Sequence, residues 1–192
     1  MLADAVTPIG YAVKGSQLAE DLWRYKSGQP GGTAATERLT ALLREFLDYH
    51  GDCAWASAGM PRPSRVAVVP SGQGRLGSHP LGRIVGACVD LPHVRMAVGP
   101  ESLSRGREAS TRWLRVRDDV AGQDILVIDD TWVSGGSAQS VAVKLKQAGA
   151  VRVAVVVLGR HVDPADPRSV AFVAALRDNS AAVSHVCLRA TR

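Results

Sequence analysis

Residues 125–137, with the sequence Ile-Leu-Val-Ile-Asp-Asp-Thr-Trp-Val-Ser-Gly-Gly-Ser, decide the fold of this chain. Four aliphatic residues open the stretch, and a short unbroken apolar run is typical of a strand covered on both faces in a parallel sheet. Asp129 and Asp130 follow where we expect this strand to end. The small residues from Ser134 to Ser137 then allow a tight turn that exposes backbone N–H groups.

A helix is predicted directly after this loop, over residues 138–148, because Val141 and Leu145 recur at helical spacing. We expect Ser137 to cap its start and Gly149 to end it. A helix N-terminus that follows a glycine-rich loop is an anion site, since free N–H groups and the helix dipole favour negative charge. The two carboxylates repel a phosphate, so they suit hydroxyl groups or a divalent cation. Ribose 5-phosphate offers a phosphate and vicinal hydroxyls together.

This stretch resembles the phosphoribosyl-pyrophosphate (PRPP) binding motif of type I phosphoribosyltransferases, in which a hydrophobic strand precedes two acidic residues and a loop of small residues. The resemblance implies that Asp129 and Asp130 hold the ribose hydroxyls as catalytic residues, and that they are the candidate contacts for a metal ion. It also implies a substrate-binding loop made of Thr131, Val133, Ser134, Gly135, Gly136 and Ser137.

The motif departs from the family at two positions. Trp132 is bulkier than the usual aliphatic residue, and Val133 replaces a common threonine. Val133 removes one hydroxyl contact, but backbone N–H groups carry most of such a site. The alternative for an acid pair alone is a solvated turn or a helix cap, whereas the whole pattern favours the phosphoribosyltransferase fold.

A second glycine-rich loop follows the predicted strand at residues 65–70. Its Gly-x-Gly-x-x-Gly pattern, with Asp90 near the expected distance, leaves a dinucleotide site as one interpretation. In the family that the chain resembles, the loop after this strand binds pyrophosphate instead. That reading assigns substrate contacts to Ser71, Gly72, Gln73, Gly74 and Arg75, although Arg75 is also compatible with an exposed surface arginine.

Residues 99–123 carry many charges and little apolar periodicity, and a long irregular segment in a compact domain is often functional. In type I phosphoribosyltransferases a mobile loop at this place closes over the active site. By resemblance, Arg105 and Arg107 bring positive charge to the pyrophosphate. A solvated surface loop is the alternative.

The N-terminal part is predicted to be helical over residues 16–25 and 36–49, where leucine and aromatic residues form apolar faces. The stretch from Tyr11 to Ala19, with Tyr25-Lys26 after it, loosely resembles the opening segment of ComF-type proteins, a subgroup associated with bacterial DNA uptake. The cysteine-rich zinc segment that often opens such proteins is missing here. A simple helical cap on the core is equally compatible.

The composition is that of a globular protein of 192 residues, with 46% hydrophobic and 21% charged residues. A net charge of +5 favours anionic ligands, but no dense basic run predicts direct nucleic-acid binding. No segment has the length of a membrane span and no signal pattern is present, so a cytoplasmic location is expected.

Later strands are predicted at residues 94–98, 151–158 and 182–188, with a short helix at 169–176. Strands that alternate with helices predict an α/β fold, a parallel doubly wound sheet of the type I phosphoribosyltransferase kind. We divide it into an N-terminal helical cap (residues 1–62) and a phosphoribosyltransferase-like core (63–192).

The resemblance implies that the protein binds PRPP with Mg²⁺ and transfers ribose 5-phosphate to an acceptor that the sequence does not identify, with release of pyrophosphate. A homodimer is compatible with this expectation. The alternative function is a non-catalytic PRPP- or nucleotide-binding regulator, or a DNA-uptake accessory protein of the ComF type. Nucleic acid enters the prediction only indirectly, through that second option.

Overall fold

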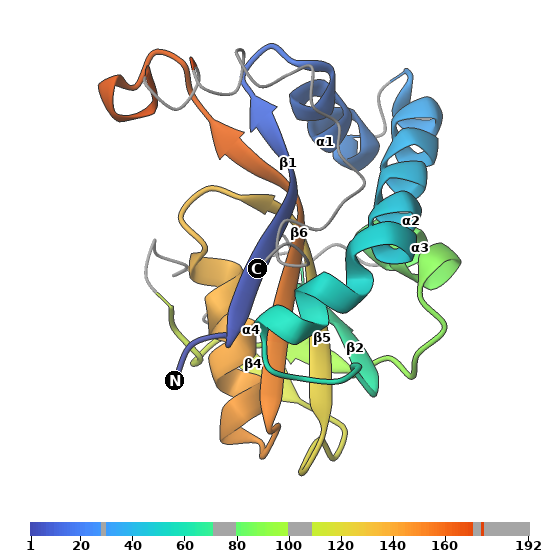
Figure 1. Cartoon of the computed structure of the whole chain (residues 1–192), viewed down its shortest axis with the longest axis vertical. Helices are drawn as coiled ribbons and strands as arrows, with labels where there is room; N and C mark the ends of the chain where they lie inside the picture. Colours follow the sequence, from blue (N-terminus) through green and yellow to red (C-terminus); the bar gives the residue numbers. More distant parts are fainter. Residues whose placement is uncertain (28–29, 71–79, 100–108, 171–173, 175–192) are drawn as a thin grey trace.

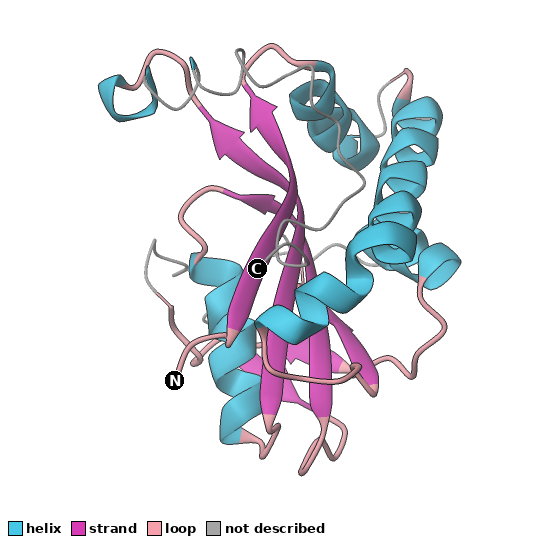
Figure 2. Ribbon diagram, viewed as in Figure 1, coloured by secondary structure: helices cyan, strands magenta, loops and turns pink. Residues whose placement is uncertain are grey.

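The structure is a computed structural model that describes residues 1–27, 30–70, 80–99, 109–170 and 174. Strands and helices alternate along most of the chain (Figures 1 and 2). In chain order they are β1 (Ala5–Val13), α1 (Gln17–Ser27), α2 (Gly32–Ser57), β2 (Arg65–Val68), α3 (Pro80–Cys88), β3 (Met96–Val98), β4 (Leu114–Val116), β5 (Asp124–Trp132), α4 (Gly136–Gln147), β6 (Arg152–Val162) and a 3₁₀ turn at Pro167–Ser169.

The centre of the molecule is a four-stranded sheet with the order β1-β6-β5-β2, in which every neighbouring pair is parallel. The two central strands are almost entirely apolar and buried over Ile125–Ile128 and Val153–Leu158. Such continuous burial is typical of parallel strands covered on both faces. Because the strands are parallel, their carboxyl ends meet at one edge, where ligands bind in open α/β sheets.

Helices cover both faces of this sheet, so the predicted α/β class with a doubly covered parallel sheet is confirmed. Figure 1 shows α1, α2 and α3 on one side and α4 on the other. Alternate residues of each strand point to opposite faces. Leu126, Ile128 and Val156 pack in the cluster with the first three helices, whereas Val127 and Val155 pack in the cluster with α4.

Strand β1 is not predicted by the sequence pattern; it pairs with β6 along the outer side of the described sheet. Pro8 and Gly10 interrupt its apolar pattern. Proline lacks an N–H donor, and it is tolerated on an outer strand because one side of that strand needs no partner. The two predicted N-terminal helices are present as α1 and α2, and they share one core cluster with the sheet. A boundary at residue 62 stays a prediction.

We expected the charged segment 99–123 to be irregular, but in its described part, residues 109–123, the structure has the strand β4. It pairs in antiparallel fashion with β3, which therefore belongs to a separate two-stranded sheet and not to the main one. With three residues and an arginine at its centre, β4 is too short to show a period. The predicted strand at 182–188 and most of the predicted helix at 169–176 lie outside the described residues.

Candidate functional site

The two carboxylates of the acid pair lie inside β5, near its carboxyl end, rather than after it. Asp129 and Asp130 are each only 8% exposed. The strand continues to Trp132 because the neighbouring β6 runs on to Val162 and keeps pairing with it. The prediction that the strand ends before the acid pair is therefore wrong, and both carboxylates are buried groups that need partners.

The adjacent carboxylates serve opposite faces of the sheet, as strand alternation requires. Asp130 points to the side of α1, where its Oδ2 accepts a very short hydrogen bond from the Tyr25 hydroxyl. The same oxygen lies 2.7 Å from Nζ of Lys26. Asp129 falls on the side of α4, and its Oδ1 accepts the backbone N–H of Asp130 at 2.9 Å. One carboxylate thus meets side chains from α1, and the other is tied to its own strand.

Tyr25 and Lys26 differ in their exposure to solvent. Tyr25 is buried, and burial followed by the nearby charge of Asp130 raises the pKa of its phenol far above its ordinary value. Tyr25 therefore stays protonated and donates to the carboxylate. The Lys26 side chain is 38% exposed, and its ammonium lies 5.6 Å from the centre of the Tyr25 ring. Lys26 consequently stands on the solvent side of this contact.

The loop after the acid pair starts α4 through a glycine in a left-handed conformation. Gly135 is the N-cap, with φ +81°, and it makes no side-chain capping hydrogen bond. Ser137 lies inside the first turn, so its predicted role as the cap is wrong. A Cβ atom at Gly135 would stand 2.1 Å from Cζ2 of Trp132, whose indole packs against the loop. Only glycine fits both the backbone angle and the space.

Because its N-cap is a glycine, α4 has no side chain at that position to compete for the N–H groups of its first turn. The first turn of any α-helix has N–H groups with no partner inside the helix, and they carry partial positive charge. Ser140 stabilises this turn, because its hydroxyl donates to the Gly136 carbonyl at 2.5 Å and accepts the Ser110 N–H at 2.9 Å. The arrangement suits a phosphate.

The structure brings together the predicted residues of the β5–α4 loop. Thr131 pairs with Gly159 in β6, Val133 and Ser134 are exposed, and Gly135 and Gly136 are buried at the helix start. The other predicted contacts lie outside the described residues: Ser71, Gly72, Gln73, Gly74, Arg75, Arg105 and Arg107. These assignments stay predictions.

The structure describes the residues that flank segments 71–79 and 100–108. Before the first segment, the Val69 N–H donates to the Ile128 carbonyl at 3.0 Å, directly ahead of the acid pair. At the second, the Gly99 N–H donates to the Trp113 carbonyl at 2.7 Å. The first contact makes β2 the neighbour of the acid pair at the carboxyl edge, as a pyrophosphate loop after β2 would require.

Sequence reasoning missed Tyr25 and Lys26 as site residues. Tyr25 lies 105 positions before Asp130 in the sequence, and Lys26 directly follows it. Only the packing of α1 against the sheet brings these two side chains to the acid pair. The nearest signal was the loose family resemblance that includes Tyr25-Lys26, which gave these residues no role. Two polar side chains at the end of an otherwise amphipathic helix carry no local sign of a distant carboxylate.

Within the described ranges, no group of three or more histidine, cysteine, aspartate or glutamate side chains is placed to hold a metal ion. Mg²⁺ often uses only one or two carboxylates together with the phosphates of its substrate, so this observation leaves the acid pair as a candidate contact. Among the described helices, none combines the length and the apolar character needed to cross a membrane.

Comparisons with known proteins find likeness only among solved structures. No protein-family model matches this sequence, and no curated protein matches it. A purine phosphoribosyltransferase from Pyrococcus horikoshii is similar at 15% identity and a TM-score of 0.40, over 68% of this chain and 88% of that one. Orotate phosphoribosyltransferase from Mycobacterium tuberculosis, in complex with PRPP, is similar at 19% identity and a TM-score of 0.41, over 77% and 85%.

A third similar structure is phosphoribosylpyrophosphate synthetase from Mycobacterium smegmatis, at 23% identity and a TM-score of 0.37, over 65% of this chain and 36% of that one. Identities and TM-scores of this size support no argument about activity. What the site can do therefore rests on its own residues.

Proposed function

We propose that this protein binds PRPP and transfers its ribose 5-phosphate group to an acceptor, with release of pyrophosphate. The observation that carries the proposal is that two buried carboxylates near the end of β5 are followed, six residues or fewer along the chain, by a helix N-terminus whose N-cap is a glycine, all at the carboxyl edge of a parallel sheet. A ligand must offer hydroxyls to the first and an anion to the second. A phosphorylated ribose offers both.

Each half of the site has a separate task in this proposal. The N–H groups at the start of α4 hold the 5′-phosphate, and the contact with Trp132 requires glycine at position 135, so this residue places no side chain beside them. Asp129 and Asp130 accept hydrogen bonds from the ribose hydroxyls, which fixes the sugar ring. Charge builds up on the departing pyrophosphate as the bond to the anomeric carbon breaks. Positioning and neutralisation of that charge supply most of the catalysis.

Magnesium fits this scheme through the ligand rather than through a protein cage. Lys26 already brings positive charge to Oδ2 of Asp130, so Asp130 suits a ribose hydroxyl better than a second cation. Asp129 is then the better candidate for contact with the ion, directly or through water. When bound, Mg²⁺ neutralises the pyrophosphate and makes it a better leaving group.

Calorimetric titration with PRPP and Mg²⁺ tests the binding half of this proposal. We expect binding of PRPP, and weaker binding of ribose 5-phosphate, which lacks the pyrophosphate. No heat of binding at millimolar PRPP, with protein shown to be folded by circular dichroism, would refute the proposal.

Pyrophosphate release in the presence of a panel of nucleobases tests the catalytic half. Release that depends on one acceptor identifies an enzyme and its substrate. PRPP binding without release for any acceptor supports the alternative, a non-catalytic PRPP-binding regulator or accessory protein of the ComF type.

A further inference from the structure

Side chains at the C-terminal end of α1 contact the acid pair. Two consecutive residues of this helix, Tyr25 and Lys26, both reach Oδ2 of Asp130. A carboxylate oxygen that meets a hydroxyl and an ammonium at once is held in place and has its charge compensated. The site described above therefore includes a segment far from it in sequence.

Close packing fixes where α1 lies on the sheet. A Cβ atom at Gly159 would stand 2.4 Å from Cδ1 of Leu22, and one at Gly10 would stand 2.8 Å from Cδ2 of Leu18. Gly10 and Gly159 are neighbours in the β1–β6 register. The two glycines thus leave a notch that receives two leucines of α1.

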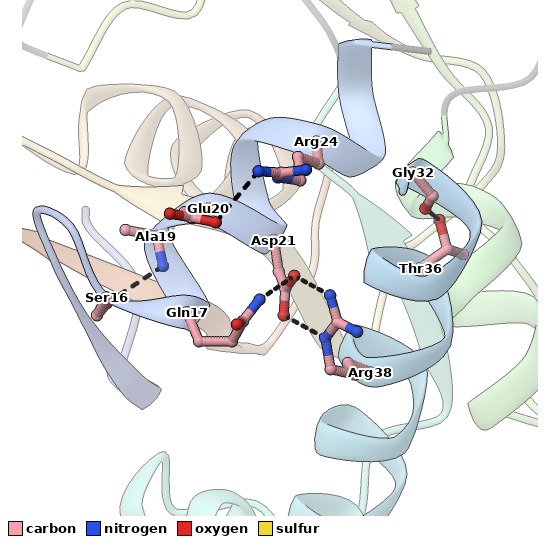
Figure 3. A network of polar contacts seen from close by, with 9 residues as sticks. All are labelled: Ser16, Gln17, Ala19, Glu20, Asp21, Arg24, Gly32, Thr36 and Arg38. Atoms are coloured by element: carbon pink, nitrogen blue, oxygen red, sulfur yellow. Dashed lines mark hydrogen bonds and ion pairs between the residues drawn. The ribbon is translucent and has the colours of Figure 1, made fainter. Parts of the chain in front are cut away.

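An ion pair between a buried aspartate of α1 and a half-exposed arginine of α2 gives α1 a second contact. Asp21 is buried, and it accepts hydrogen bonds from Nε and Nη2 of Arg38 in α2 at 2.8 and 2.6 Å (Figure 3). Gln17 donates to the same carboxylate at 3.0 Å. We call the pair of Asp21 and Arg38 the clamp. Asp21 lies one helical turn before Tyr25, so the clamp and the notch together determine the position of the helix end.

We propose that Lys26 is a ligand-binding residue of this site, a cation that bridges Asp130 and an oxygen of the phosphorylated sugar. This inference rests on the proposed function and adds to it a residue from the N-terminal helix. Tyr25 is the buried partner of the carboxylate, whereas the side chain of Lys26 is 38% exposed and accessible to a ligand from solvent.

The chemistry of the ammonium group supports this role. It carries three N–H donors, so a contact with Oδ2 of Asp130 is compatible with a further one to a ligand oxygen. A lysine also follows a ligand more easily than a tyrosine does, because its four-carbon stem is flexible.

Calorimetric titration with ribose 5-phosphate of the wild-type chain, Lys26→Met and Lys14→Met tests the inference. Lys14 is a matched control, because it pairs with Asp163 at 3.6 Å and is largely exposed. We expect Lys26→Met to weaken binding about tenfold or more, as for the loss of a charge-assisted hydrogen bond, while Lys14→Met changes it less than about twofold. Lys26→Arg, which keeps the charge, is expected to lie between wild type and Lys26→Met.

A second measurement reports contact directly. Reductive methylation of lysines, followed by mass spectrometry of the peptides, is expected to slow at Lys26 and not at Lys14 when ribose 5-phosphate is present. This measurement also covers the case in which Lys26→Met does not fold.

The following results would overturn the inference. Equal or tighter binding by Lys26→Met would mean that Lys26 only competes with the ligand for Asp130. Equal losses in both variants would indicate general electrostatic attraction, and absence of protection at Lys26 would exclude contact. If the wild-type chain does not bind ribose 5-phosphate or PRPP at all, the proposed function fails and this inference fails with it.

Discussion

The two faces of the sheet contribute different chemistry to its carboxyl edge. On the face of α4, the contribution is backbone: a left-handed glycine begins the helix without a side-chain cap. On the face of α1, the contribution is side chains: Tyr25 and Lys26 converge on a single carboxylate oxygen. Asp129 and Asp130 are adjacent in sequence, yet they belong to these two different environments.

This difference determines how far each half of the site can be predicted from sequence and how it responds to substitution. Backbone recognition depends on local conformation, so it is visible as glycine in a short motif and is lost when the glycine is replaced. Side-chain recognition across the sheet depends on how a helix docks, so it is invisible locally and weakens in steps. Substitutions on the α4 face should therefore abolish ligand binding, whereas those on the α1 face should weaken it gradually.

The largest effect is expected for Gly135→Val, which strikes the backbone half. Valine is strained at φ +81°, and its Cβ would overlap the Trp132 ring, 2.1 Å from Cζ2. The loop must change shape, so we expect calorimetry to show no binding of ribose 5-phosphate or PRPP, which share the 5′-phosphate. Gly122→Val is a useful control, because Gly122 also has positive φ (73°) but lies at the opposite edge of the sheet. Wild-type affinity in folded Gly135→Val would disprove a phosphate site at this loop.

The next effect is expected for Asp129→Asn together with Asp130→Asn. Asparagine has the same shape, so the fold should remain, but each lost charge-assisted hydrogen bond to a ribose hydroxyl costs roughly 1.5–3 kcal/mol of binding free energy. Calorimetry with PRPP measures the loss, and circular dichroism checks the fold. Undiminished affinity in the folded double variant would show that the acid pair is only structural.

A smaller effect is expected for Arg38→Met, which releases α1 without touching the acid pair. Asp21 would lose two hydrogen bonds while it stays buried, so the free energy of unfolding should fall by about 1–3 kcal/mol. Affinity for ribose 5-phosphate should fall too, since α1 carries Tyr25 and Lys26. Glu20→Gln is the control, because the Glu20–Arg24 pair on the same helix is exposed. Denaturant unfolding that shows equal stability for wild type and Arg38→Met would mean that the Asp21–Arg38 pair does not hold α1 in place.

The pH dependence of this clamp has a definite sign. The hydrogen bonds from Arg38 are the main cause that lowers the pKa of Asp21 below its ordinary value of 3.8. A group whose pKa is lower in the folded state stabilises the fold above its unfolded pKa, and this contribution is lost as the pH falls through the folded pKa. The stability difference between wild type and Arg38→Met should therefore shrink in acid below about pH 4.

The sequence predicted the parts of the fold that depend on local pattern. The apolar runs of β5 and β6 and the glycine before α4 follow from residues that are neighbours in the chain, and the site loop could be placed from them. It did not predict β1, because Pro8 and Gly10 fit a strand only once its outer position is known.

The α1 half of the site could not be predicted, for a related reason. The contact between Tyr25 and Asp130 joins residues 105 positions apart. It exists because two glycines on neighbouring strands accept two leucines of α1, and neither the glycines nor the leucines indicate a carboxylate nearby. The wrong prediction of Ser137 as the N-cap of α4 also came from a contact between side chain and backbone that the local pattern does not show, because Trp132 and Gly135 together determine where the helix starts.

The smallest effect concerns Tyr25 and appears only at alkaline pH. Burial and the charge of Asp130 raise the pKa of this phenol well above its ordinary value of 10.0. The folded chain therefore keeps a proton that the unfolded chain releases above pH 10, so the stabilising contribution of Tyr25 is complete below that pH and declines above it. One proton corresponds to about 1.4 kcal/mol per pH unit, and Tyr25→Phe lacks this decline.

Urea unfolding of both proteins from pH 8 to 11 should therefore show wild type losing stability faster by about 1 kcal/mol over the last unit. All other ionising groups are common to both chains, so they cancel in the difference. Parallel curves across this range would mean that Tyr25 ionises as freely in the folded chain as in the unfolded one, and that the hydroxyl does not hold Asp130.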